Sequence, residues 1–238
     1  AGVTLLIGHH RRSSSKYQFL RDIIDSGRLG KIVAIQSRYC IAKDEDCFDR
    51  DWYVTKGVGG PLLINAIHDF DDLNFVIGKS PVKVYAATRN TIRENEAEDS
   101  ASVLIEYENG VTATYVVCDG TPSPWNYDLA ADENELFVMS PGENSMQVFG
   151  TKGSFGFPNM DLYYYDDDAF GWTHELKHEH FDVELNIPLK AELEHFIDLC
   201  LGRETTPRCS GEEGLRTLKI VNGVFESAET GNAVYLQS

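Results

Sequence analysis

Residues 56–78, KGVGGPLLINAIHDFDDLNFVIG, place charged side chains inside an otherwise apolar helix. Pro61 suits the first turn, because its missing N–H would have no intrahelical partner there, and Gly78 suits a left-handed helix end. The residues between them are apolar nearly all round, which predicts a buried helix. His68 and Asp71 lie three residues apart and therefore share one face of it. A buried imidazole and carboxylate need polar partners or a chemical task.

The composition narrows the class of protein. The chain has 238 residues, of which 42% are hydrophobic, so it holds one large domain or two small ones. Its formal charge of −17 argues against partners such as nucleic acid or an anionic membrane. No apolar run is long enough to span a membrane, and no secretory signal opens the sequence. The five cysteines are scattered without a CxxC pair, which favours reduced thiols in a cytoplasmic protein.

The order of hydrophobic patterns predicts an α+β fold: a large, mainly antiparallel open sheet with helices packed on one face. The strongest hairpin signal is Asn109-Gly110, where we expect both turn residues to have positive φ. Ser13–Ser15 supply caps for the first helix. Strands are predicted at 3–8, 31–39, 82–88, 100–107, 111–118, 135–139, 145–149, 154–157, 162–165 and 233–236, and helices at 16–26, 61–77, 188–202 and 211–230.

Five segments of the chain carry recognisable motifs: VTLLIGHHRRSSSKYQFLRDIIDSGRLGKIVAIQSRY, GVGGPLLINAIHDFDDLNFVIG, SVLIEYENGVTATYVV, MQVFGTKGSFGF and the stretch from PLKAELEHF to GNAVYL. Taken together and in this order, they resemble the Gfo/Idh/MocA oxidoreductases, which include glucose–fructose oxidoreductase and inositol dehydrogenase. The resemblance implies a dihydrodipicolinate-reductase-like C-terminal domain at residues 13–238, which binds substrate and makes the oligomer. Residues 1–12 would be the last strand of a preceding Rossmann domain. We expect the rest of that domain to be absent from this chain, because no GxGxxG follows a strand and no Glu-Lys-Pro occurs.

The resemblance also implies a function for the complete protein. We expect it to transfer hydride between NAD or NADP and a sugar, polyol or related hydroxy compound, with the dinucleotide bound mainly by the absent N-terminal domain. This chain alone is then expected to be inactive. The implied partners are a small carbohydrate-like substrate and further copies of the chain, in a homodimer or homotetramer paired through the open sheet face. A non-enzymatic sugar-binding regulator of the same fold is the alternative.

His68 occupies the position of the family's catalytic histidine, so we predict that it moves the hydroxyl proton. A neutral imidazole suits that role near pH 7. The alternative is a core histidine bonded to a backbone carbonyl. Many members carry an aspartate four residues earlier, where this chain has Ile64. Asn65 is predicted to offer its amide to the substrate instead, and the change leaves both polyol specificity and catalysis open.

Polar residues at the end of the first strand extend the predicted site. The resemblance places this end near the nicotinamide and the substrate. We favour His10 and Arg12 there over their neighbours, because an arginine fork can hold a carboxylate or phosphate. The alternative is a solvated turn. Trp52 and Lys56 are further candidates for substrate binding, with packing for Trp52 and solvent exposure for Lys56 as the alternatives.

A competing motif, HELKH at residues 174–178, satisfies the zinc-hydrolase pattern HExxH. That chemistry needs a helix that projects both imidazoles to one side. The alternation that continues downstream is typical of a strand, on which His174, His178 and His180 would share a face. A zinc hydrolase that uses His174 and His178 is therefore the least favoured function, and we predict no metal site.

Overall fold

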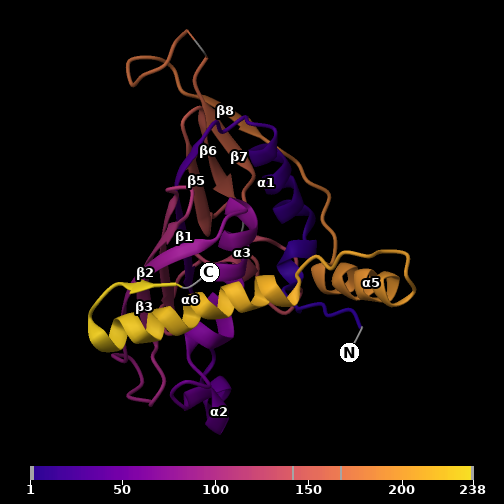
Figure 1. Cartoon of the computed structure of the whole chain (residues 1–238). Coiled ribbons are helices and arrows are strands. Elements are labelled where there is room, and N and C mark those ends of the chain that lie inside the picture. The colour runs from indigo at the N-terminus through magenta and orange to yellow at the C-terminus, as the bar shows by residue number, and fades with distance from the viewer. Residues whose placement is uncertain (1–2, 141, 167, 237–238) are drawn as a thin grey trace.

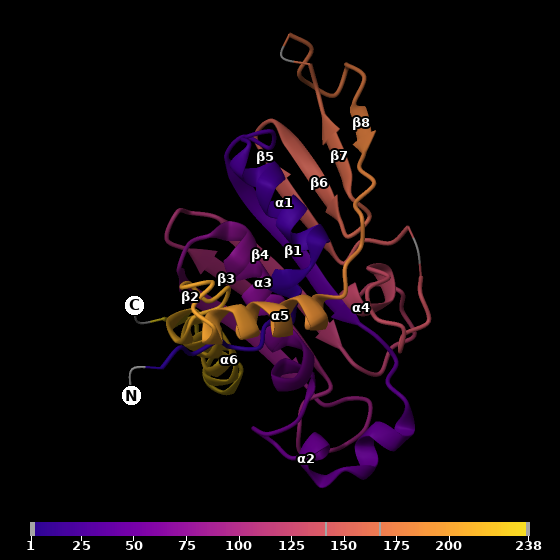
Figure 2. The same ribbon diagram turned by 90° about the vertical axis from the view of Figure 1, so that its right-hand side faces the viewer.

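The computed structural model describes residues 3–140, 142–166 and 168–236. A nine-stranded sheet has the order β8-β7-β6-β5-β1-β4-β3-β2-β9, with α1, α3 and α6 packed on one face (Figures 1 and 2). The predicted α+β class and the helices on one face are confirmed. The strands are β1 Ile32–Cys40, β2 Pro81–Arg89, β3 Ser100–Tyr107, β4 Thr112–Cys118, β5 Met146–Gly150, β6 Gly153–Phe157, β7 Asp161–Tyr164, β8 Lys177–His180 and β9 Val234–Tyr235. The helices are η1 His10–Ser13, α1 Ser15–Asp25, η2 Glu45–Asp49, α2 Asp51–Val54, η3 Leu62–Ala66, α3 Ile67–Ile77, α4 Tyr127–Ala130, α5 Pro188–Cys200 and α6 Gly211–Thr230.

Strand β1 lies inside the sheet although it is the first strand along the chain. It pairs in parallel with β4 and antiparallel with β5, while the other neighbouring strands pair antiparallel. Ile35 lies opposite Ala113 and Val148, and all three are buried in the core. The next residue, Gln36, is exposed opposite Thr114. This period of two gives the sheet one covered and one open face.

Helix α3 is the most buried helix and packs against both β1 and α6. Phe70 and Leu73 are fully buried in the core, and Gly78 ends the helix with φ of 65°, as predicted. Ser14 caps α1 by accepting hydrogen bonds from the backbone N–H groups of Lys16 and Tyr17. Both helices therefore begin or end at the residue types that the sequence supplies for that purpose.

Helix α6 carries the clearest cap. The Ser210 hydroxyl accepts from the backbone N–H of Glu213, and the Glu213 carboxylate accepts from the backbone N–H of Ser210. We expect Ser210→Ala to lower the free energy of unfolding by about 1 kcal/mol and the melting temperature by roughly 2–4 °C, because an N–H at the helix start loses its partner. Thermal unfolding measures this. Ser210→Asn is the control, because its side-chain oxygen can accept the same hydrogen bond, and it should cost at most a few tenths of a kcal/mol; equal losses in the two variants would contradict the capping role.

Some predicted elements differ from the structure. Residues 3–9 form no strand; Ile7 instead donates its backbone N–H to Cys209 before α6. Residues 135–139 also form no strand, and Leu136 is 90% exposed there. The β3–β4 turn has positive φ only at Gly110, so it is not the expected turn with two such residues. No described helix is both long and apolar enough to cross a bilayer.

The helix predicted at 61–77 is also not uniform. Its first part, η3, is a π-helix, in which the backbone N–H of Ile67 bonds the carbonyl of Leu62. Single π turns inside α-helices are frequent at functional sites. This turn contains Asn65 and ends directly before the α-helical turn that carries His68.

Candidate functional site

His68 meets two histidines from the segment that precedes α1. Nδ1 of His9 lies 3.3 Å from Nδ1 of His68, and the two rings meet edge to face. The His10 ring lies on His68 as well, with 5.5 Å between ring centroids. The side chain of His68 is half-buried rather than sealed in the core. Three imidazoles therefore lie together where the N-terminal segment crosses α3. His68 and His10 were predicted as site residues from the sequence, whereas His9 was not.

All three imidazoles are held neutral near pH 7. Burial lowers the pKa of His68 to about 3, and the Arg11 guanidinium lowers it further. Burial likewise lowers the pKa of His10 to about 4. The pKa of His9 is lowered by burial, although the Asp71 carboxylate opposes that shift. A neutral imidazole has one nitrogen with a proton and one without, so it can accept or donate a proton at a bound hydroxyl.

Arg11 fixes the N-terminal segment to α3 through a buried ionic cluster. Its Nη1 donates to Asp69 at 2.9 Å and to Asp72 at 3.1 Å, and its Nη2 lies 3.4 Å from Asp128. Burial raises the pKa of Asp72 to about 8 and that of Asp69 to about 6, although Arg11 lowers both. The Arg11 guanidinium thus faces three carboxyl groups. Because burial raises the pKa of Asp72 most, Asp72 is the one that favours the protonated form near pH 7.

Three tyrosines complete this cluster from other elements. The hydroxyls of Tyr17, Tyr39 and Tyr115 each donate at 2.7 Å, to Asp72, Asp128 and Asp69 respectively. These side chains come from α1, β1 and β4, so the cluster ties the helices to the centre of the sheet. Buried carboxyl groups with such partners avoid the cost of unpaired polar atoms.

Arg12 forms a second buried ion pair. Its Nε and Nη2 donate to the two oxygens of Asp71 at 2.7 and 2.9 Å, and its Nη1 donates to Glu213 on α6. The Arg12 side chain is 3% exposed. The prediction that Arg12 holds a substrate carboxylate or phosphate does not fit this placement, because the guanidinium already binds carboxylates of the protein. Asp71, which also accepts from Thr217, joins α3 to the segment 9–12 and to α6.

A cavity of about 490 Å³ opens beside the start of the α3 helix. Asn65 lines it, and the buried Oδ1 of Asn65 has no hydrogen-bond partner among the described residues. The loop at 136–138 borders the cavity, where a strand had been predicted. Polar groups from several elements line it together with apolar side chains, namely Tyr39, Lys43, Asp44, Tyr53 and Ser123. Such a mixed lining is typical of small-molecule sites.

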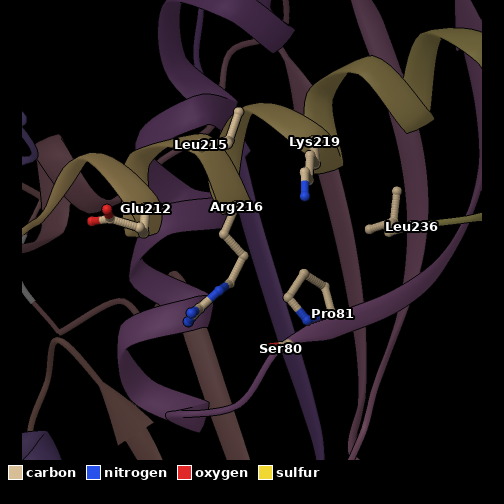
Figure 3. Close-up of a pocket in the computed structure, with 7 residues that line it drawn as sticks. All are labelled: Ser80, Pro81, Glu212, Leu215, Arg216, Lys219 and Leu236. Carbon is tan, nitrogen blue, oxygen red and sulfur yellow. The ribbon is translucent and has the colours of Figure 1, made fainter. Parts of the chain in front are cut away.

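Trp52 and Lys56 do not reach this cavity. Both are exposed, Trp52 at 48%, and it is Tyr53 of α2 that lines the cavity instead. No sequence signal separates Tyr53 from Trp52, because both lie on one short helix. A separate hollow lies between α6 and the start of β2, bordered by Pro81, Leu215 and Arg216 (Figure 3). None of the predicted site residues borders that hollow.

The HExxH segment is not a helix. His178 and His180 lie on β8, and His174 is in the loop before it. The alternating residues 181–187, on which the strand was predicted, form no strand. Both β8 imidazoles bond the same oxygen of Asp161, at 2.7 and 2.9 Å. No group of three or more metal-ligating side chains with suitable geometry occurs within 3–140, 142–166 and 168–236. The arrangement required for a zinc hydrolase is therefore not formed by these residues.

Comparisons with known proteins agree with the fold. The chain is 25% identical to an uncharacterised oxidoreductase, YrbE, of Bacillus subtilis and 27% identical to inositol 2-dehydrogenase of Rhizobium meliloti. These matches cover 99% and 94% of this chain but only 64% and 62% of the relatives' length. Among solved structures, an oxidoreductase from Agrobacterium radiobacter in complex with NAD+, L-tartaric acid and magnesium has a TM-score of 0.73 at 18% identity, over 98% of this chain and 65% of that one.

The family model of the GFO/IDH/MocA C-terminal domain matches residues 17–156, more than half of the chain, and that range includes β1, α3 and the β3–β4 hairpin. It also includes His68 and Asn65, whereas the segment with His9 and His10 precedes it. This chain therefore belongs to the GFO/IDH/MocA family.

Proposed function

We propose that this chain is the substrate-binding part of an NAD(P)-dependent oxidoreductase that acts on a sugar, polyol or related hydroxy compound. The observation that carries the proposal is the half-buried, neutral imidazole of His68 one turn after Asn65, whose side chain lines a cavity of about 490 Å³. Inositol 2-dehydrogenase of Rhizobium meliloti and D-xylose 1-dehydrogenase of Haloarcula marismortui, both relatives along most of this chain, support the substrate class.

His68 is assigned the proton transfer. In the oxidation direction, its unprotonated ring nitrogen accepts the hydroxyl proton of the substrate, while a nicotinamide group, when bound, takes the hydride from the carbinol carbon. Burial holds the pKa of His68 near 3 and keeps the ring in the accepting form before the reaction. His10 faces the same imidazole and is assigned to the side on which substrate and nicotinamide meet.

Binding of the dinucleotide is assigned to a domain outside this chain. That domain is assigned to pack against α5 and the segment 3–8. Apolar side chains of α5 are exposed although η1 packs on the same helix. They are Leu189, Leu193, Phe196 and Ile197; Leu201 directly after the helix is also exposed, each of these at least 41%, and so are Val3 and Leu5. A contiguous apolar surface of this kind indicates a protein partner. The chain alone is then expected to show no turnover, and saturable oxidation of NADH by it would contradict this assignment.

The open sheet face is assigned to contact between copies of the chain in a homodimer or homotetramer. Apolar side chains from neighbouring strands are exposed on it, among them Tyr85, Leu104 and Val116. The covered face already has its helices, so a second sheet is the simplest cover for the open one. Gel filtration with light scattering measures the subunit number, and a monomer at all concentrations would contradict this part of the proposal.

Asn65 is assigned to bind a substrate hydroxyl with its side-chain amide. We expect Asn65→Ala to weaken binding of the best ligand from a sugar and polyol panel by about tenfold, because a hydrogen bond to a buried amide contributes roughly 1–1.5 kcal/mol. Isothermal titration with the protein that contains this chain measures the change. Asn95→Ala, a substitution outside the residues that line the cavity, is the matched control. An unchanged affinity in Asn65→Ala would exclude the assignment.

The function itself is tested with the complete protein that contains these residues. Formation of reduced nicotinamide is followed with NAD or NADP and a panel of pentoses, hexoses, inositols and sugar acids. Saturable reduction with a member of the panel is the expected result. Saturable binding of a panel member without any reduction would instead favour the non-enzymatic regulator, a role that Ile64 in place of the usual aspartate keeps open.

A further inference from the structure

The Nδ1 atoms of His9 and His68 form one hydrogen bond, which has room for a single hydrogen atom. Nδ1 of one ring lies 3.3 Å from Nδ1 of the other, so one nitrogen must carry the proton and the other must accept it. Both rings are neutral near pH 7, because burial lowers the pKa of each. Which ring donates then determines where the remaining proton of each imidazole lies.

Asp71 resolves that choice through the other side of His9. Nε2 of His9 lies 3.9 Å from Oδ1 of Asp71, and Arg12 holds this carboxylate with two hydrogen bonds. The distance is too long for a hydrogen bond, but both side chains are buried, at 8% and 0% exposure, where charges act strongly over such distances. A carboxylate favours N–H over a lone pair on the nitrogen that faces it. His9 therefore carries its proton on Nε2 and accepts on Nδ1.

We infer that His9 is a positioning residue, which makes His68 the Nδ1-protonated tautomer and leaves Nε2 of His68 as a free proton acceptor. No described residue forms a hydrogen bond with Nε2 of His68. The groups that face the pair are His10, Arg11, Arg12 and Asp71, and only the last is an anion. The assignment of the tautomer stands on this geometry, whereas its use in catalysis rests on the proposed function.

The same arrangement gives the incoming proton a path. When a hydroxyl proton forms a bond to Nε2 of His68, the Nδ1–H bond of His68 can break as an N–H bond forms at Nδ1 of His9. The positive charge then lies on His9, near Arg11 and Arg12 but 3.9 Å from the Asp71 carboxylate, instead of on His68, which faces Arg11 without a carboxylate. An aspartate–histidine pair that fixes the tautomer of a reacting group has the same logic in hydrolytic triads.

Nitrogen NMR of this chain, with the histidine rings labelled with ¹⁵N, tests the inference without any enzyme assay. The shifts separate protonated from unprotonated ring nitrogens, and His68→Gln assigns the His68 signals by their loss. We expect Nδ1 of His68 to be protonated and Nε2 to be bare at pH 7. In His9→Phe the acceptor is removed, and the proton of His68 should move to Nε2. His10→Phe is the matched control, in which the His68 tautomer should stay as in the wild type.

The wild-type spectrum alone shows which nitrogen of His68 carries the proton, so the inference is tested even if His9→Phe fails to fold. A His68 ring protonated on Nε2 in the wild type would overturn the inference, as would an unchanged tautomer in folded His9→Phe. The result is separate from the proposed function. The expected spectra in a protein without dehydrogenase activity would support the tautomer assignment and reject the function, whereas an active enzyme with Nε2 protonated would do the reverse.

Discussion

In the complete enzyme, His68→Gln is expected to lower kcat by about 10²–10⁴-fold, the range of a positioned general acid or base. Glutamine keeps a polar side chain of similar reach but cannot take up a proton near neutral pH. The KM for the hydroxy substrate should change much less, because the glutamine amide can still form a hydrogen bond with the substrate hydroxyl. Steady-state kinetics at saturating NAD or NADP measure both quantities.

His174→Gln is the control for this experiment. His174 is exposed in the loop before β8 and is not among the residues of the candidate site. The same chemical change there should leave kcat within error of the wild type. A His68→Gln enzyme with wild-type kcat would remove this imidazole from the mechanism and return it to the role of a core histidine.

Arg11→Met is expected to lower the free energy of unfolding by about 3–5 kcal/mol, because it leaves the buried Asp69 carboxylate without its cation and removes a hydrogen bond from Asp72. Asp69 and Asp72 are 4% and 1% exposed, so water cannot take the place of the guanidinium. At roughly 2–4 °C per kcal/mol for a chain of this size, the melting temperature should fall by about 6–20 °C. Denaturant unfolding and thermal unfolding measure the two effects.

The matched control is Arg203→Met. Its guanidinium pairs with Asp198 at 3.2 Å, but the two side chains are 68% and 39% exposed. Exposed pairs contribute about 0–1 kcal/mol, so this variant should unfold close to the wild type. If the two variants lost equal stability, the buried cluster around Arg11 would have no special part in holding the N-terminal segment to α3.

Local sequence signals predicted most of the helices and strands. Ser210 and Gly231 bound α6 at the positions that a cap residue and a left-handed glycine require. The alternating pattern of apolar residues predicted a strand wrongly at 135–139, where the side chains are exposed. Leu136 and Val138 alternate like a strand, yet both are almost fully exposed in a loop beside the cavity. A two-residue period gives no information on whether a neighbouring strand is available to pair.

The candidate site was predictable only in part, because its partners are far apart in sequence. The apolar helix marked His68 as a buried polar residue that needs a partner or a task, but its proton-transfer role came from the resemblance to the family. The ion pairs of Arg11 and Arg12 reach residues on α3, α4 and α6, and no spacing rule connects those positions. His9 and His10 are adjacent in the sequence, so no sequence pattern distinguishes them. Only the folded structure shows that His9 is the one that forms a hydrogen bond with His68.

The central place of β1 has a consequence for how the chain acquires its structure. This strand is made early in synthesis, but both of its neighbours, β4 and β5, emerge much later. Until then its backbone N–H and C=O groups and its apolar side chains lack their final partners. Pairings between such distant segments slow folding and prolong the exposure of strand edges. We therefore expect the nascent chain to depend on chaperones until at least residue 150 has left the ribosome.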